Sequence, residues 1–196
     1  MSGAFFVAPA TFVGTHNAPC CTLAPSNTGE PMSGPFPLTK AHRAALLSAA
    51  GTLVVIAAVT AFVLANAAAL NGSVLVPGLL DIAFHYNPGI SFGLFAQDTQ
   101  TGSRLLIAVA TLFIGLLCWF AWKATRPLIG AGLGMLIAGA LVNVVDRALH
   151  GAVFDYLVVH LGPQPLFVCN APDVAISVGF ALWLAGEYLP PRVDQG

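Results

Sequence analysis

The chain has 196 residues, of which 57% are hydrophobic and only 8% are charged. A soluble domain carries about 25% charged residues, so this chain lacks the charge that a water-exposed surface needs. Its hydrophobicity excludes disorder for most of its length. The seven Lys and Arg against eight Asp and Glu leave no positive field for nucleic acid. The remaining class is an integral membrane protein.

The first 38 residues differ in composition from the rest of the chain. They hold six of the 14 prolines and many Ser, Thr and Gly, and they show no periodicity. This composition predicts a disordered cytoplasmic tail at residues 1–38, followed by a membrane domain at residues 39–196. Because the first basic residue is Lys40, the tail does not resemble a secretory signal peptide. Two roles stay open, a dispensable tail and a regulatory or partner-binding segment.

Three stretches contain no charged residue, and a fourth carries Asp173 and Glu187 only near its ends. Each approaches the length of about 20 apolar residues that a helix needs to cross the hydrocarbon. None alternates with the period of a barrel strand. The expected fold class is an all-α integral membrane protein: four transmembrane helices with a small extracytoplasmic β-rich loop region. The expected spans are residues 44–70, 105–122, 127–146 and 171–189.

Two loops between the spans carry their own patterns. Residues 71–104 include the alternating β-prone side chains of Ile82, Phe84 and Tyr86 beside glycines, which predicts a small sheet at the membrane interface. Residues 151–161 mix apolar side chains with two polar ones. We expect this stretch to form an amphipathic helix on the membrane surface, with a packed loop as the alternative.

The basic residues predict the orientation of the spans. Arg104 and Arg147 lie on one side if all four segments cross, and the other five basic residues lie on the opposite side. Positive charge favours the cytoplasmic side, so both termini are expected in the cytoplasm and residues 71–104 and 146–173 outside. The five residues on the cytoplasmic side are Lys40, Arg43, Lys123, Arg126 and Arg192.

The four cysteines do not predict a disulfide framework. Cys20 and Cys21 belong to the tail, Cys118 lies mid-span, and Cys169 alone faces the outer side. No spacing of Cys and His resembles a zinc site, and the three outer histidines are interpreted as interfacial or surface residues.

Two aspartates lie at the outer ends of the third and fourth spans. Asp146 and Asp173 each follow an asparagine by three residues, which places amide and carboxylate on one helix face. The two spans are antiparallel neighbours, so their outer ends can meet. Two carboxylates brought together share a proton, so one can activate water while the other protonates a scissile carbonyl.

A structural alternative also fits these residues. Asp146 can pair with Arg147, and Asp173 can cap the N-terminus of the fourth helix, where a carboxylate is favoured. Consecutive helix residues point in different directions, which makes Asp146 and Arg147 a poor pair.

Three sequence blocks within residues 44–189 form a recognisable pattern. Asn87–Gly93 matches Asn-x-Gly-x-x-Phe-Gly. Gly139–Arg147 is similar to Gly-Asn-x-x-Asp-Arg, and Gly151–Tyr156 to the Val-x-Asp-Phe that follows it. Asn170–Asp173 is similar to Phe-Asn-x-Ala-Asp. With these blocks, residues 44–189 resemble the signal peptidase II family, the lipoprotein signal peptidases.

The resemblance implies a membrane-embedded aspartic endopeptidase with Asp146 and Asp173 as its catalytic pair. It implies that the enzyme cuts lipid-modified prolipoproteins before the diacylglyceryl cysteine. It also implies a monomer in the bacterial inner membrane, with prolipoproteins and membrane lipid as partners and no nucleic acid. No metal and no cofactor are expected from the resemblance. Asp155 is expected to support its loop rather than do chemistry. The implied substrate-binding positions are Asn87, Gly89, Phe92, Asn143, Arg147 and Asn170.

The chain departs from the family pattern at several positions. The first span lacks the Asp and Lys that family members carry, since residues 59–66 contain neither. Val142 replaces a glycine, Cys169 a phenylalanine and Pro172 an alanine. These changes indicate a divergent member or a specialised paralogue. The alternative function is that of a non-catalytic paralogue, which binds lipidated substrates or partner proteins without cutting them.

Overall fold

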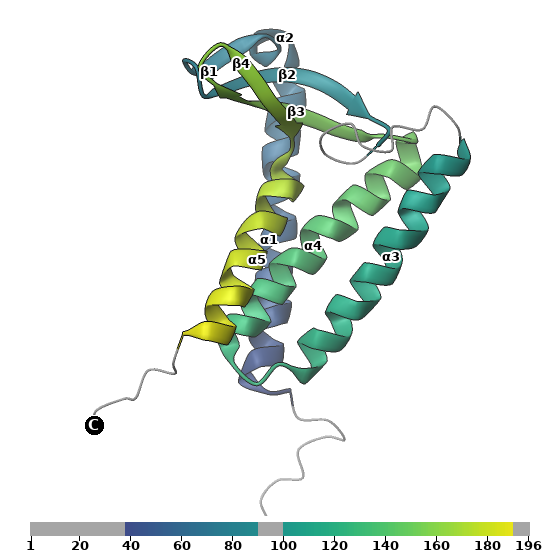
Figure 1. Ribbon diagram of the computed structural model, residues 1–196, viewed down its shortest axis with the longest axis vertical. Coiled ribbons are helices and arrows are strands. Elements are labelled where there is room, and N and C mark those ends of the chain that lie inside the picture. The colour runs from purple at the N-terminus through teal and green to yellow at the C-terminus, as the bar shows by residue number, and fades with distance from the viewer. Residues whose placement is uncertain (1–37, 90–99, 190–196) are drawn as a thin grey trace, which may run out of the picture. The chain divides into compact units, whose positions relative to one another are not determined.

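The computed structural model describes residues 38–89 and 100–189, with side chains from residue 102 onward in the second range. The tail predicted at residues 1–38, apart from its last residue, and Phe92 lie outside the described residues. The elements, in chain order, are α1 (Lys40–Ala65), α2 (Ala67–Leu70), β1 (Ser73–Val76), β2 (Leu80–Asn87), α3 (Gln100–Lys123), α4 (Pro127–His150), β3 (Val153–Leu161), β4 (Gln164–Cys169) and α5 (Ala171–Tyr188) (Figure 1).

Within the described residues, three helices are long and apolar enough to cross a membrane, namely α1, α3 from Gly102, and α4. They fall on the first three predicted spans. Over the fourth predicted span lies α5, which has 18 residues and is not one of these three. The first helix ends earlier than predicted, at Ala65, because Asn66 leaves helical geometry and its side chain donates to the Phe62 carbonyl oxygen.

The helix α4 packs against α1, α3 and α5 (Figure 1). Glycines allow the close approach on two sides. A Cβ on Gly130 would overlap the carbonyl oxygen of Ala41 in α1, and one on Gly132 would lie 2.7 Å from the carbonyl oxygen of Gly179 in α5. Small residues of this kind let membrane helices pack backbone against backbone. Leu133, the next residue of α4, is fully buried and belongs to the hydrophobic core.

The four strands form one antiparallel sheet in the order β1-β2-β3-β4. Strands β1 and β2 confirm the small sheet predicted within residues 71–104. The surface helix predicted at residues 151–161 is wrong, as is the packed loop, because this stretch is the central strand β3. Its Val-rich sequence favours a strand, and β2 and β4 pair with its backbone on either side. The described fold is therefore not all-α.

The end of α4 also differs from the prediction. The third span was expected to end at residue 146, whereas α4 continues for one more turn to His150. Gly151 then ends the helix in a left-handed conformation with φ of 77°, which glycine adopts at no steric cost. Asp146 and Arg147 are consequently held by a regular helix rather than by a loop.

The packing of α4 on α1 can be tested with Gly130→Ala. The new Cβ would overlap the Ala41 backbone, so we expect a loss of about 1–3 kcal/mol in stability from overpacking. The measurement is thermal unfolding in detergent. Gly115→Ala in α3 is the matched control, because nothing lies within 4 Å of that site. Equal unfolding temperatures for the two variants would contradict this packing.

Candidate active site

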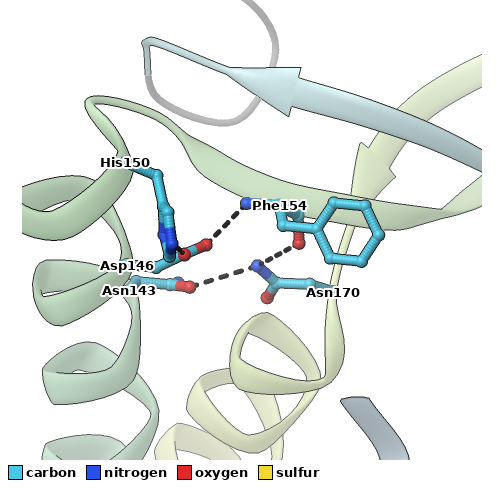
Figure 2. A network of polar contacts seen from close by, with 5 residues as sticks. All are labelled: Asn143, Asp146, His150, Phe154 and Asn170. Carbon is cyan, nitrogen blue, oxygen red and sulfur yellow. Dashed lines mark hydrogen bonds and ion pairs between the residues drawn. The ribbon is translucent and has the colours of Figure 1, made fainter. Parts of the chain in front are cut away.

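The last turns of α4, the first turn of α5 and strand β3 meet around one cavity. Its volume is about 360 Å³, and its lining includes Asn143 and Asp146 from α4, Tyr156 from β3, and Asn170 and Pro172 at the start of α5. The prediction that the ends of these two helices meet is confirmed by a hydrogen bond between Asn143 and Asp173. Figure 2 shows part of the polar network between α4, β3 and α5, formed by Asn143, Asp146, His150, Phe154 and Asn170.

Asp173 is held by both helices. Its Oδ2 accepts from the backbone N–H of Asn170 at 3.1 Å, and its own N–H donates to Asn170 Oδ1 at 2.9 Å. These bonds form the capping box at the start of α5. Its Oδ1 accepts from Asn143 Nδ2 at 2.8 Å. The capping role considered for Asp173 is therefore present, and one oxygen also contacts α4.

Asp146 lies one turn beyond Asn143 on α4. Its Oδ1 is 2.6 Å from Nδ1 of His150, and its Oδ2 accepts from the N–H of Phe154 at 2.7 Å (Figure 2). Asp146 thus ties the end of α4 to the start of β3. The pairing of Asp146 with Arg147 that the sequence allowed is wrong, since Arg147 instead donates from Nη2 to the carbonyl oxygen of Gly89 at 2.6 Å.

Asp155 is the most buried carboxylate of the site, with 2% of its surface exposed. Its two oxygens accept from Asn87 Nδ2 and Asn170 Nδ2, each at 3.0 Å. Burial raises the pKa of Asp155 to about 6, the Asn87 hydrogen bond lowers it, and the charge of Asp173 raises it further. The sequence prediction gave Asp155 only a supporting role, although an acidic residue inside a stretch of Val, Phe and Tyr signals a buried charge.

The turn after β2 is fixed by side chains from the same network. Asn87 Oδ1 accepts from the N–H of Gly89 at 3.0 Å, a local turn that asparagine favours. Arg147, which is 8% exposed, holds the carbonyl oxygen of Gly89 from α4. The predicted substrate-binding residues therefore fall into two groups, with Asn87, Gly89 and Arg147 near Asp155 and Asn143 near Asp173. Asn170 joins the two groups because it contacts both carboxylates.

No cluster of three or more His, Cys, Asp or Glu side chains that could hold a metal occurs in the part of the chain that the structure describes.

The comparisons with known proteins show the family of the chain. The family model for signal peptidase (SPase) II matches residues 44–188. The chain belongs to the signal peptidase II family.

Individual relatives show how far the match to signal peptidase II extends. The chain is 41% identical over 108 residues to a lipoprotein signal peptidase of Beijerinckia indica, a match that covers 55% of this chain and 65% of that protein. It is 38% identical over 139 residues to one from a Methylobacterium species, covering 69% of this chain and 83% of the relative. The chain thus spans slightly less than two thirds of the first relative.

A solved structure of a bacterial membrane enzyme has the same fold. Its TM-score is 0.60 at 21% identity, and the match covers 78% of this chain and 93% of that one. Together with the three apolar helices, the family match identifies the chain as a bacterial membrane protein.

The departures from the signal peptidase II pattern fit the described geometry. Pro172 is the second residue of α5, where its missing N–H would have had no partner within the helix. Val142 is half-buried and lines the cavity. Cys169 is buried at the end of β4, where burial raises the pKa of its thiol to about 11.

The raised pKa of Asp155 predicts a pH dependence of stability. A carboxyl with a folded pKa of about 6 and an ordinary unfolded pKa near 4 stabilises the fold below that lower value. This contribution, at most about 3 kcal/mol, is lost as the pH rises through 6. We expect the stability of the wild type relative to Asp155→Asn to increase as the pH falls from 7 to 4. Chemical unfolding in detergent measures it, and a pH-independent difference would contradict the assignment.

Proposed function

We propose that this chain is an aspartic endopeptidase that removes signal peptides from lipid-modified prolipoproteins, cutting before the diacylglyceryl cysteine. Membership of the signal peptidase II family supports the reaction class, and curated relatives named lipoprotein signal peptidase support the substrate class. The observation that carries the proposal is the position of Asn170. Its side chain donates to Asp155 at 3.0 Å and its backbone N–H donates to Asp173 at 3.1 Å, so one residue brings two carboxylates together beside a cavity.

Such a pair can do the chemistry of an aspartic protease. Two carboxylates in one poorly solvated site do not both ionise cheaply, so they retain a proton between them. The ionised member activates a water molecule, and the protonated member donates to the carbonyl oxygen of the scissile bond. A pKa of about 6 for Asp155 keeps this shared proton available close to neutral pH.

The described contacts help to decide which carboxylate pairs with Asp173. The sequence predicts Asp146, whose oxygens contact His150 and the Phe154 N–H. Those contacts fix the Asp146 carboxylate between α4 and β3. The hydrogen bonds described for Asp155 come from neutral amides, and Asp155 interacts electrostatically with Asp173 and Arg147. We therefore favour Asp155 and Asp173 as the reacting pair, with Asp146 as a positioning residue; Asp146 and Asp173 remain the alternative.

The membrane supplies the remaining part of the mechanism. We propose that α5 crosses the bacterial inner membrane as a fourth span, with both termini of the chain in the cytoplasm. The sheet and the carboxylates then lie at the outer headgroup region. A substrate held in the bilayer by its acyl chains presents its scissile bond at that depth, which restricts the search for a reactive geometry. Asn87, Gly89 and Arg147 would shape the substrate contact, and a monomer suffices for the site.

A cleavage assay on a diacylglyceryl prolipoprotein tests the proposal. We expect Asp173→Asn and Asp155→Asn each to lower kcat by about 10²–10⁴-fold, because each removes a group that transfers a proton. Asp146→Asn should cost less, because it loosens only the junction of α4 and β3. Asp81→Asn is the matched control, since this carboxylate lies in β2 and pairs with His160 at 3.0 Å.

Two outcomes of this assay decide between the alternatives. Loss of cleavage in Asp146→Asn with retained cleavage in Asp155→Asn would identify Asp146 as the partner of Asp173. Absence of cleavage by the wild type would favour the non-catalytic paralogue that binds lipidated substrates.

The proposed topology can be tested with reporter fusions that end at Arg126, His160 and Leu189. Arg126 lies between α3 and α4, His160 lies in β3, and Leu189 follows α5. Four spans predict a cytoplasmic signal at Arg126 and Leu189 and an outer signal at His160. A cytoplasmic signal at His160 would reverse the orientation, and an outer signal at Leu189 would mean that α5 does not cross.

A further inference from the structure

The hydroxyl group of Tyr156 lies where three elements meet. The side chain is 1% exposed, and it is one of the largest fully buried residues of the described chain. Its Oη accepts from the backbone N–H of Ala171, the first residue of α5, at 3.2 Å. The side chain of Thr60 in α1 interacts with the same hydroxyl. One oxygen therefore connects β3, α5 and α1.

The contact between Tyr156 and Ala171 lies close in sequence to both Asp155 and Asp173. Tyr156 follows Asp155 directly in β3, and Ala171 lies two residues before Asp173 in the first turn of α5. The Asn170 side chain joins the same two segments through Asp155. The hydrogen bond of the Tyr156 hydroxyl is thus a second connection between β3 and the start of α5. Two connections fix both the distance and the relative rotation of these segments, whereas one connection leaves the rotation free.

Nothing else within α5 can satisfy the N–H that Tyr156 accepts. The first N–H groups of a helix have no carbonyl partner in that helix, and this one is next to the buried Asn170. Thr60 in turn holds the hydroxyl from a part of α1 that carries no charged residue between Val59 and Asn66. Both Thr60 and Tyr156 line the cavity of the proposed site.

We propose that Tyr156, anchored by Thr60, is a positioning residue that sets the separation of the Asp155 and Asp173 carboxylates. The inference rests on the proposed function and on Asp155 as the partner of Asp173. Removing the hydroxyl leaves the ring in place but frees the first turn of α5. A small displacement of a reacting group costs rate rather than binding, so the effect falls on kcat.

The pH profile supplies a signature that a general loss of stability would not give. The charged groups around Asp155 are Asp173, Arg147 and Asp146. Burial and the Asp173 charge keep the pKa of Asp155 high, and both effects weaken when the segments separate and water enters. The alkaline limb of the kcat profile, where the shared proton is lost, should therefore move to lower pH.

The test compares Tyr156→Phe, Thr60→Val and the wild type in the prolipoprotein cleavage assay. We expect Tyr156→Phe to lower kcat about tenfold with KM changed less than about twofold, and the alkaline limb to shift to lower pH. Thr60→Val should show the same pattern at a smaller size, because the bond from Ala171 remains. Thr52→Val is the matched control, since Thr52 lies on the same helix but lines a different, apolar cavity.

A second measurement does not depend on activity. Hydrogen–deuterium exchange of a peptide covering residues 168–175 reports the first turn of α5, and we expect faster exchange in Tyr156→Phe than in the Thr52→Val control. Unchanged exchange would show that the Tyr156 hydroxyl does not hold the first turn of α5. A wild-type kcat and pH profile in Tyr156→Phe would overturn the role of Tyr156 in positioning the carboxylates. A wild type that does not cleave, but whose exchange responds to Tyr156→Phe, would instead refute the proposed function.

Discussion

The arrangement of the site depends on the hydrogen bonds of one buried residue, Asn170. Its Oδ1 caps α5 by accepting from Asp173, while its Nδ2 lies within 3.4 Å of acceptors on Asn143, Phe154 and Asp155. Asn170 is 2% exposed, so an amide left without partners there would be costly. An amide offers both a donor and an acceptor group, which is why one side chain can join α4, β3 and α5 at the same point.

Close packing of α4 and α5 makes these short polar contacts possible. A Cβ on Gly139 would lie 2.6 Å from the carbonyl oxygen of Pro172, so only glycine lets the helices approach at that level. Asn143 is one turn further along α4, and there its side chain reaches Asp173. In lipid, where burial of apolar surface gives little drive for helix association, such backbone contact and interhelical hydrogen bonds stabilise the pair. The close packing of α4 on α5 and the polar network at the ends of these helices therefore depend on each other.

The sequence predicted those parts of the structure that follow from local patterns. Uncharged stretches located α1, α3 and α4, and the three-residue spacing of Asn143 and Asp146 placed both on one face of α4. Strand β3 was missed because a short apolar run with scattered polar residues fits a strand or an amphipathic helix equally well by periodicity. Pairing with β2, which is distant in sequence, decides that this run forms a strand. The central position of Asp155 was missed for the same reason, since its burial arises only once the sheet forms.

Charge balance supports the shared proton that the proposed mechanism requires. Arg147 is buried and interacts electrostatically with Asp155, Asp173 and Asp146, so one guanidinium faces three carboxylates. Asp146 also contacts His150 at 2.6 Å. A single positive charge stabilises only one ionised carboxylate in a poorly hydrated region. In the proposed mechanism the other carboxylate therefore keeps its proton, because a protonated acid beside an ionised one is the state that acid–base hydrolysis of a peptide bond requires.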